Sequence, residues 1–252
     1  MTWLYGIDTS FDQITDSEAQ LLRQAGVRVA AQCLWTGGQQ PAPRVTNLRT
    51  YKNAGIAIAG YISLTATGQG SWHAQQGRNG VPDDLWADLK HVFIDIELQG
   101  IQAGNVRQAV NFVQGLGKPK SIYTSWNAWK NYMGDPTTFT DCLLWNAFWD
   151  NDEDIDFASA PFGGWTVDKV ICEQWSGGTN VQGVYADRNQ FRADAFGLAV
   201  APPSTPVPVP PPPPTDAQWL GAAGAGAALA LLYTQRAQPD DALKAKVRYL
   251  VG

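Results

Sequence analysis

The sequence predicts an α/β fold: a somewhat irregular (β/α)-barrel of TIM type, followed by a Pro-rich linker and a short helical tail. Up to about residue 200, short apolar runs alternate with amphipathic stretches, as they do in repeated βα units. Eight strands are expected, most of them followed by a helix, in roughly 200 residues. The first strand is not followed by a Gly-rich phosphate loop, so a closed barrel is preferred to an open doubly wound sheet.

The individual elements follow from apolar periodicity and from turn residues. Strands are expected at residues 3–8, 27–35, 56–63, 91–97, 121–124, 142–148, 169–175 and 183–187. Helices are expected at residues 17–25, 45–53, 83–90, 105–116, 126–132 and 188–195. The first helix follows Asp16, a good N-cap, and Gly26 lies just past its end, where glycine favours termination.

The composition changes near residue 200, so three parts are expected: a barrel over 1–200, a linker over 201–215 and an apolar helical tail over 216–252. The linker contains nine Pro and should form an extended, semi-rigid spacer. Residues 217–235 carry no charge and approach the roughly 20 apolar residues needed to cross a bilayer. The tail is therefore interpreted as a membrane-interacting helix, a helix that packs on a partner protein, or a poorly ordered end.

The net charge and the scarcity of metal-binding side chains exclude several classes of function. A formal net charge of −5, with no Lys/Arg run of four or more, argues against a nucleic-acid partner. Cys33, Cys142 and Cys172 match neither a disulfide framework nor a zinc spacing. With only His73 and His91, a histidine metal cage or a Ser–His hydrolase is not expected. We expect no organic cofactor and no catalytic metal, and chemistry that depends on carboxylates.

The strongest local signal is a pair of acids at the end of an apolar strand. Asp95 and Glu97 follow the buried run 92–94, and residues i and i+2 of a strand point to the same face, about 7 Å apart at Cα. In a βα-barrel, active sites form at the carboxyl ends of the strands. The spacing is compatible with carboxyl groups about 5–5.5 Å apart, the separation associated with retention in glycoside hydrolysis. The alternative is two solvated or salt-bridged carboxylates.

Two further acids are expected at the same end of the barrel. Asp8 ends the first predicted strand and Asp187 ends the last, and the first and last strands of a closed barrel are neighbours. Either acid alone could instead cap a turn or a helix. Residues 150–154 (DNDED) look like the start of a calcium loop, but Ile155 and Pro161 stand where that loop needs Gly and an acid, so a solvated loop is preferred.

Five short motifs follow one another along residues 3–195. They are GIDTS at 6–10, FIDIE at 93–97, IYT at 122–124 with Trp126, LWNA at 144–147, and QW at 174–175 with GVYADRNQF at 183–191. In this order they resemble the family 25 glycoside hydrolases, the Chalaropsis-type lysozymes. The chitinase type fits less well, because Lys90 and Phe93 stand where its acidic strand needs Asp.

The resemblance implies cleavage of the β-1,4 bond between N-acetylmuramic acid and N-acetylglucosamine. It assigns Glu97 as the general acid and Asp95 as a nucleophile or as the group that orients the acetamido group of the substrate. Asp8 and Asp187 would complete the acidic floor. The substrate would be held by Tyr123, Trp145, Trp175, Tyr61 and Gln174.

Three departures from the family pattern concern substrate preference more than the fold. Residues 60–64 (GYISL) lack the aromatic residue and the His that usually follow the Tyr. Residues 33–38 (CLWTGG) lack the usual Lys. Glu173 stands where a Trp is expected, and Trp175 stands where a Tyr is expected.

The favoured function is an antimicrobial peptidoglycan muramidase, a phage endolysin or a virion-associated hydrolase. The first residues lack the basic and apolar regions of a signal peptide. The protein is therefore expected to be made in the cytoplasm and to act at the bacterial cell wall after holin-type release or as part of a virion. A membrane or a virion protein is the expected partner of residues 216–252. The alternative is a catalytically inactive glycan-binding or structural barrel of a phage tail or cell-surface assembly.

Overall fold

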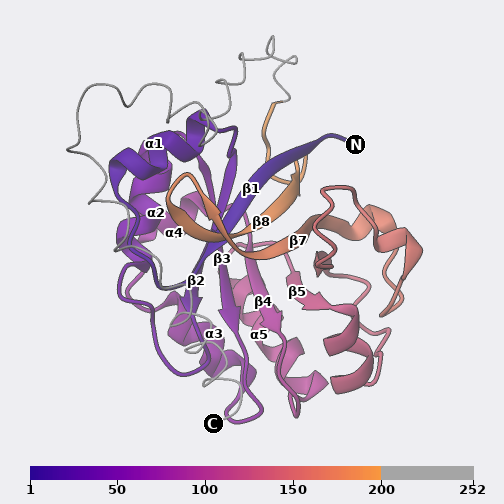
Figure 1. Ribbon diagram of the computed structural model, residues 1–252. Coiled ribbons are helices and arrows are strands. Elements are labelled where there is room, and N and C mark those ends of the chain that lie inside the picture. Colours follow the sequence, from indigo (N-terminus) through magenta and orange to yellow (C-terminus); the bar gives the residue numbers. More distant parts are fainter. Residues whose placement is uncertain (200–252) are drawn as a thin grey trace, which may run out of the picture. The chain divides into compact units, whose positions relative to one another are not determined.

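A computed structural model describes residues 1–199 and shows a closed barrel of eight strands (Figure 1). The strands follow one another around the barrel in sequence order, and β1 closes the ring by pairing with β8. The closed α/β barrel predicted from the sequence is therefore confirmed. The predicted linker (201–215) and tail (216–252) lie outside the described residues.

The strands are β1 (Trp3–Thr9), β2 (Val29–Trp35), β3 (Ala57–Ser63), β4 (Val92–Ile96), β5 (Ser121–Ser125), β6 (Leu143–Ala147), β7 (Val170–Val181) and β8 (Val184–Arg192). The helices are α1 (Asp16–Gln24), α2 (Arg44–Asn53), α3 (Gly70–Arg78), α4 (Asp83–Asp88) and α5 (Ala103–Gly115). Shorter helical turns are η1 (Ala128–Tyr132), η2 (Phe157–Ser159) and η3 (Val167–Lys169). No helix within residues 1–199 is both long and apolar enough to cross a membrane.

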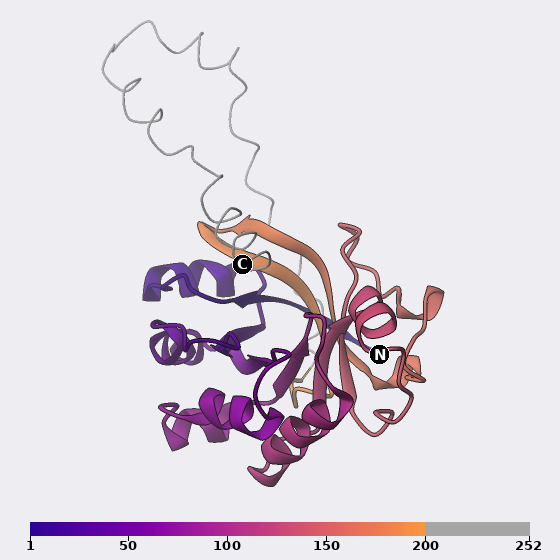
Figure 2. The ribbon, with the colours of Figure 1, turned by 90° about the horizontal axis from the view of Figure 1, so that it is seen from below.

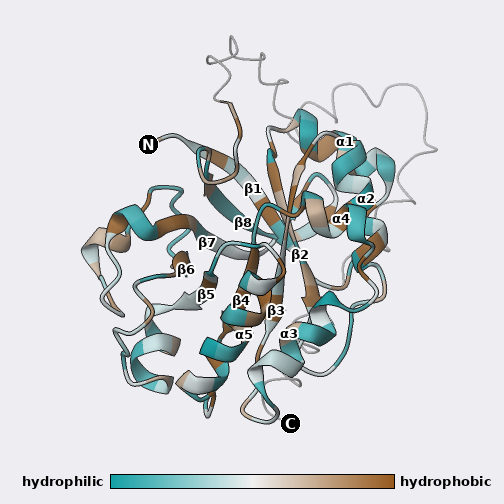
Figure 3. Cartoon of the chain, turned by 180° about the vertical axis from the view of Figure 1, so that it is seen from behind, coloured by the Kyte–Doolittle hydropathy of each residue, from teal (hydrophilic) through white to brown (hydrophobic). Residues whose placement is uncertain are grey.

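The helices cover only part of the barrel. Helices α2, α3 and α5 pack against β2, β3 and β4, whereas the connection between β6 and β7 contains only the short turns η2 and η3. Seen from below, the indigo-to-purple helices lie along one side of the ring, and the orange β7–β8 hairpin crosses the ring next to β1 (Figure 2). In α5 the buried residues Val106, Ala109, Val110 and Val113 recur at helical spacing between polar ones, so hydrophobic and hydrophilic segments alternate along the helix (Figure 3). This is the amphipathic pattern that predicted the helix.

Helix α1 begins one residue earlier than the sequence predicted. Its N-cap is Thr15, whose side chain accepts a hydrogen bond from the Glu18 N–H while the Glu18 carboxylate accepts from the Thr15 N–H. This capping box satisfies two helix-end donors, so Asp16 is the first helical residue and not the cap. Gly26 has a φ of +99°, a left-handed conformation that glycine adopts readily, and it follows the helix as predicted.

Strand β8 corrects the largest error of the sequence analysis. The predicted strand at 183–187 and helix at 188–195 are instead one strand that runs to Arg192, antiparallel to both β7 and β1. A tight turn at Gln182 and Gly183, both with positive φ, reverses the chain after β7. Buried Asn189 and Phe191 alternate with more exposed neighbours, which is a period of two and not a helical period.

Helix α3 was not predicted, because its sequence contains two glycines that weaken a helical pattern. Both glycines are required by close packing. A Cβ on Gly70 would lie 1.7 Å from the Asn105 carbonyl oxygen, and a Cβ on Gly77 would lie 2.4 Å from the Ile62 side chain. The residues that lower helix propensity are the ones that let α3 approach α5 and β3.

Candidate active site

The four predicted acids lie at one end of the barrel, where β1 and β4 end and β8 begins. Asp8 and Asp187 are directly opposite each other in the antiparallel β1–β8 pair. Asp187 reaches this position because it lies near the start of β8, which runs antiparallel to β1 and β7. It does not lie at the end of a parallel strand, as was predicted. Asp95 is the last residue but one of β4, and Glu97 is the first residue after this strand. The structure therefore brings the four predicted acids to one end of the barrel, although the last strand runs antiparallel and not parallel.

Gln174 on β7 connects these acids. It is 1% exposed, and its side-chain amide nitrogen donates to Asp8 Oδ2 at 2.8 Å and to Asp187 Oδ2 at 3.3 Å. Its amide oxygen accepts from the Tyr123 hydroxyl at 2.9 Å and from the Trp149 indole nitrogen at 2.6 Å. Carboxylates only accept and an indole N–H only donates, so the amide has one possible orientation. Gln174 was expected to hold substrate; in the structure both ends of its buried amide are bound to other side chains.

Asp8 accepts a second hydrogen bond, from a residue on β8. Asn189 on β8 donates to Asp8 Oδ2 at 2.8 Å, and its own amide oxygen accepts from the Trp145 indole nitrogen at 2.8 Å. Trp145 is 1% exposed, with its ring 4.7 Å from Tyr123 and 4.9 Å from Phe93 between centroids. The expected sugar contact for Trp145 does not fit this burial. Its place is in the apolar interior of the barrel, where it orients Asn189.

Asp95 and Glu97 have different surroundings. Asp95 is 4% exposed, and its Oδ2 accepts from the hydroxyl of Ser63, the residue beside it in the β3–β4 pair. Glu97 is exposed, and its Oε1 accepts from the Tyr123 hydroxyl at 3.2 Å. One carboxylate is therefore fixed inside the end of the barrel, while the other meets solvent where a ligand can approach.

The pKa of Tyr123 responds to all four carboxylates. Burial raises the pKa of its phenol well above the usual value, and the negative charges of Glu97, Asp95, Asp8 and Asp187 raise this pKa further. The Tyr123 hydroxyl therefore keeps its proton at any ordinary pH. It remains available as a donor both to Glu97 and to Gln174.

The other two predicted substrate residues differ in position. Tyr61 is half-buried, and its hydroxyl is 2.6 Å from that of Ser10 at the end of β1, so it stays at the edge of the site. Burial is the main cause that raises its pKa well above the usual value, and the negative charge of Asp8 raises this pKa further. Trp175 is 8% exposed and lies against the Arg188 guanidinium, 5.5 Å from its ring centroid. Little of the Trp175 ring is left for the sugar contact expected of it.

Exposed aromatic side chains follow four of the strands, and they were not among the residues predicted to bind substrate. Phe11 is 55% exposed, Trp72 45%, Trp126 40% and Trp149 57%. They follow β1, β3, β5 and β6 respectively, so all four lie in segments at the carboxyl end of the barrel. The signal that could have found them is position: each follows a strand by less than ten residues.

Glu173, the unusual neighbour of Gln174, belongs to a separate cluster. It is 1% exposed, and it accepts from the Asn146 amide at 2.6 Å and from the Asp156 backbone N–H at 2.8 Å. Burial raises the pKa of its carboxyl. Glu173 thus attaches the β6–β7 connection to β7. Within residues 1–199, no three His, Cys, Asp or Glu side chains are grouped so that they could hold a metal ion, the acidic stretch at 150–154 included.

No family model matches the chain, but its relatives among curated proteins include two from Dictyostelium discoideum, counting factor 50 and probable GH family 25 lysozyme 3. Counting factor 50 is 29% identical over 187 residues, which cover 69% of this chain and 61% of that protein. Probable GH family 25 lysozyme 3 is 26% identical over 197 residues, which cover 74% of this chain and 40% of that protein. The chain thus matches less than two thirds of the length of either relative.

Comparison with solved structures identifies the fold. A family GH25 lysozyme from Aspergillus fumigatus matches with a TM-score of 0.63 and 16% identity, over 76% of this chain and 94% of that one. The lysozyme from Streptomyces coelicolor matches with a TM-score of 0.63 and 18% identity, over 79% and 98% of the two chains. The catalytic domain of endolysin ply40 from bacteriophage P40 of Listeria monocytogenes matches with a TM-score of 0.56 and 15% identity, over 78% and 96%. Residues 1–199 therefore have the fold of the family 25 lysozymes.

Proposed function

We propose that this barrel is a glycoside hydrolase of the family 25 type, a muramidase that cleaves the β-1,4 bond between N-acetylmuramic acid and N-acetylglucosamine in peptidoglycan. The observation that carries the proposal is the group of four carboxylates at one end of the barrel, of which Asp8, Asp187 and Glu97 are connected by hydrogen bonds through Gln174 and Tyr123. The lysozyme fold of the barrel supports the same function.

Glu97 is the proposed general acid. A glycosidase acid must donate its proton to the leaving oxygen and take a proton back later, so both protonation states need a partner. The Tyr123 hydroxyl has two possible acceptors, Glu97 Oε1 at 3.2 Å and Gln174 Oε1 at 2.9 Å. It can donate to Glu97 when Glu97 is ionised, and to Gln174 when Glu97 carries the proton. Rotation of one hydroxyl therefore accommodates both states.

Asp95 is the proposed stabiliser of the oxocarbenium-like transition state, either as a nucleophile or by orienting the acetamido group of the substrate. Its burial and its hydrogen bond from Ser63 keep the carboxylate in one position. Asp8 and Asp187 are held together by Gln174 and add negative charge beneath the developing positive charge of the sugar. The exposed rings of Trp72, Trp126 and Trp149 offer apolar faces on which sugar rings can stack.

The test is hydrolysis of purified peptidoglycan, with the released fragments identified by mass spectrometry after reducing-end labelling. Glu97→Gln should lower the rate about 10²- to 10⁴-fold, the usual loss when a general acid is removed. Glu18→Gln is the matched control: Glu18 is half-buried on α1, where it caps the helix, and glutamine also serves at this capping position. New reducing-end muramic acid from the wild type and the control, but not from Glu97→Gln, is the expected result.

A second candidate function is a catalytically inactive, glycan-binding or structural barrel. It is favoured by one observation: the first of the two relatives is named a counting factor and not a lysozyme. The same experiment separates the candidates. If neither wild type nor Glu97→Gln releases fragments from several types of cell wall, while both bind them, the binding function replaces the enzyme.

The biological setting is a further part of the proposal: a phage endolysin or virion-associated hydrolase, made in the cytoplasm and acting at the bacterial cell wall. Similarity to the ply40 endolysin domain supports it. Residues 216–252 would then contact a membrane or a virion protein. Expression of the full chain in bacteria, with and without a pore-forming protein, tests this setting. Lysis only with the pore is expected; lysis without it would contradict release by other proteins.

A further inference from the structure

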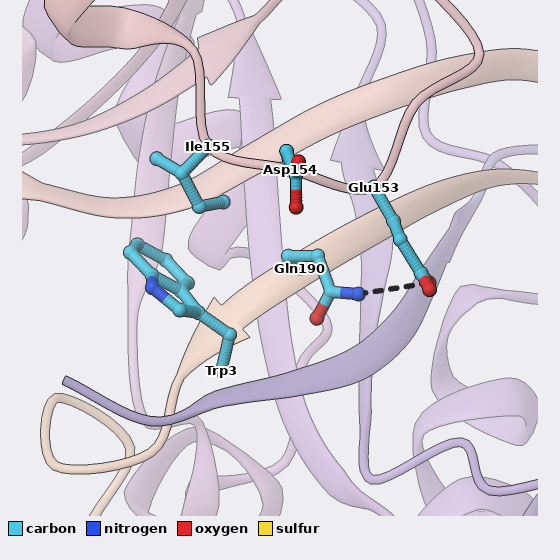
Figure 4. A pocket seen from close by; sticks show the side chains of 5 residues that line it. All are labelled: Trp3, Glu153, Asp154, Ile155 and Gln190. Atoms are coloured by element: carbon cyan, nitrogen blue, oxygen red, sulfur yellow. Dashed lines mark hydrogen bonds between the residues drawn. The ribbon is translucent and has the colours of Figure 1, made fainter.

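A second pocket lies on the outer face of the barrel, between β1, β8 and the β6–β7 connection. Its volume is about 460 Å³, and its lining residues are Trp3, Glu153, Asp154, Ile155 and Gln190. Figure 4 shows Trp3 and Ile155 on one side, Glu153 on the other and Gln190 between them. The volume falls within the range of roughly 300–1,000 Å³ that is usual for small-molecule sites.

The pocket exists because this side of the barrel has no covering helix. Gln190 lies opposite Tyr5 in the β1–β8 pair, and Trp3 precedes Tyr5 by two residues, so all three share one face of the sheet. Asp8 lies opposite Asp187 in the same pair and faces the other way. The pocket is therefore separated from the acids by the sheet itself and, at Trp3, by five residues or about 17 Å along β1.

The walls of the pocket combine an aromatic face with open hydrogen-bonding groups. Trp3 is half-buried against the core, which fixes its indole without covering it. One N–H of the Gln190 amide donates to Glu153 Oε2 at 3.3 Å, which orients that amide. The Gln190 carbonyl, its second N–H and the Asp154 carboxylate remain available beside the ring.

The loop that lines the pocket is acidic. The loop contributes Glu153 and Asp154 to the pocket, and Asp150, Asp152 and Asp156 lie close to them in the chain. The pKa of Asp156 is raised, first by its hydrogen bond to Asp150, then by desolvation and by the charges of the neighbouring acids. Arg188 and Arg192 lie on the same face of β8 as Gln190, and Arg192 is paired with Asp194. The charged residues that line the pocket itself, Glu153 and Asp154, favour a neutral ligand over an anion.

We propose that this pocket is an accessory subsite for a neutral saccharide unit. The indole of Trp3 would stack against the apolar face of a sugar ring, while Gln190, Glu153 and Asp154 would bind its hydroxyl groups. Carboxylates and a primary amide suit hydroxyls because together they accept and donate. The inference rests on the proposed glycan function and extends it: the barrel would hold its polymer at two places, one catalytic and one not.

The direct test is 19F NMR of the full chain labelled with 5-fluorotryptophan. The Trp3 resonance is identified by its loss in Trp3→Phe, and that of Trp149 by its loss in Trp149→Phe. Titration with chitotriose should shift the Trp3 resonance saturably. Gln190→Ala and Glu153→Ala should each weaken this effect about tenfold, the usual loss for one anchoring contact, and should leave the Trp149 titration unchanged. Asp84→Asn, at an exposed position on α4, is the control.

A second readout uses activity. If the pocket retains the polymer, Gln190→Ala should lower hydrolysis of insoluble peptidoglycan and leave hydrolysis of short soluble fragments unchanged, because avidity matters only for a long ligand. A Trp3 resonance that ignores chitotriose overturns the proposal, and so does one that responds equally to lysine amide, since that would indicate an amine site. Neither result affects Glu97, whose test is bond cleavage.

Discussion

Two buried glutamines lie on either side of strand β1, and they serve different purposes. Gln32 on β2 is fully buried beside Thr9, and Gln174 on β7 is 1% exposed beside Asp8. Thr9 and Asp8 are consecutive, so their side chains leave β1 on opposite faces. Each glutamine uses both ends of its amide in hydrogen bonds.

The partners of the two glutamines differ in charge. Gln32 accepts from Thr9 at 3.0 Å and from Asn47 at 2.8 Å, and it donates to the backbone oxygens of Ser10 and Cys33. All of these groups are neutral, so the network contains no charge that another group must compensate. It attaches β2 to β1 and, through Asn47, to α2.

Gln174 instead donates to two carboxylates and accepts from a phenol that contacts a third. Gathering negative charge in this way costs stability unless something offsets it. The comparison teaches that a buried polar network does not by itself indicate a site. What distinguishes the functional network is an excess of like charge next to exposed aromatic rings.

The largest expected effect comes from removing each amide in turn. Gln32→Met leaves several buried groups without partners and should lower the free energy of unfolding by about 3–5 kcal/mol, with little change in the rate per folded molecule. Gln174→Met should lower the hydrolysis rate about 10²-fold, because the carboxylates and Tyr123 lose their common partner. Chemical denaturation and peptidoglycan hydrolysis measure the two quantities. Equal losses of stability and of rate in both variants would remove the distinction.

A buried histidine extends the comparison to a titratable group whose hydrogen-bond partners, like those of Gln32, are neutral. His91 precedes β4 at the other end of the barrel, with ring nitrogens 3.0 Å from Ser121 Oγ and from the Ala195 carbonyl oxygen. Burial lowers its pKa from 6.5 to about 4. Neutral His91 thus contributes stability above about pH 6.5, and this contribution is lost as the pH falls through about 4.

The lost stability should amount to about 3 kcal/mol at most, since one pKa unit corresponds to roughly 1.4 kcal/mol. The proton NMR titration of the His91 ring checks this, with an expected midpoint near 4. A midpoint near 6.5 would mean that the His91 ring is hydrated and that its surroundings tolerate a positive charge.

The smallest expected effect compares two buried tyrosines. The Tyr51 hydroxyl is 3.0 Å from Thr9 Oγ1 in the neutral network, and the Tyr123 hydroxyl lies between Gln174 and Glu97. Tyr51→Phe should lower the free energy of unfolding by about 1 kcal/mol and leave the rate unchanged. Tyr123→Phe should lower the rate about tenfold and move the alkaline limb of its pH profile upwards, because ionised Glu97 loses a donor. An unchanged pH profile would contradict the proposed role of Tyr123.

Much of the fold was predictable because local patterns carry it. Six of the eight predicted strands have nearly the observed bounds, since each is an apolar run with turn residues on either side, whereas β7 runs six residues past its predicted end at 175. The failure at 188–195 has a physical reason. The residues after Asp187 look like a capped helix locally, but pairing with both β1 and β7 decides their conformation.

The position of the four acids was also predictable, because acids at the ends of apolar strands meet at one end of a closed barrel. The roles of the aromatic residues were not. Trp145 and Trp175 match short motifs yet are 1% and 8% exposed, whereas Trp149, 57% exposed, lies in a segment that the motifs do not include. Exposure depends on what the rest of the chain covers, and a motif does not contain that information.

The sequence by itself determined the barrel, the order of its strands and the acids that gather at one end. Only the tertiary structure decided the direction of β8, the burial of Trp145 and the role of Gln174 as the connection between the acids. The reason is the range of the contacts. Gln174 and Asp8 are separated by 166 residues and Asn189 and Asp8 by 181, so their hydrogen bonds exist only once the barrel has closed.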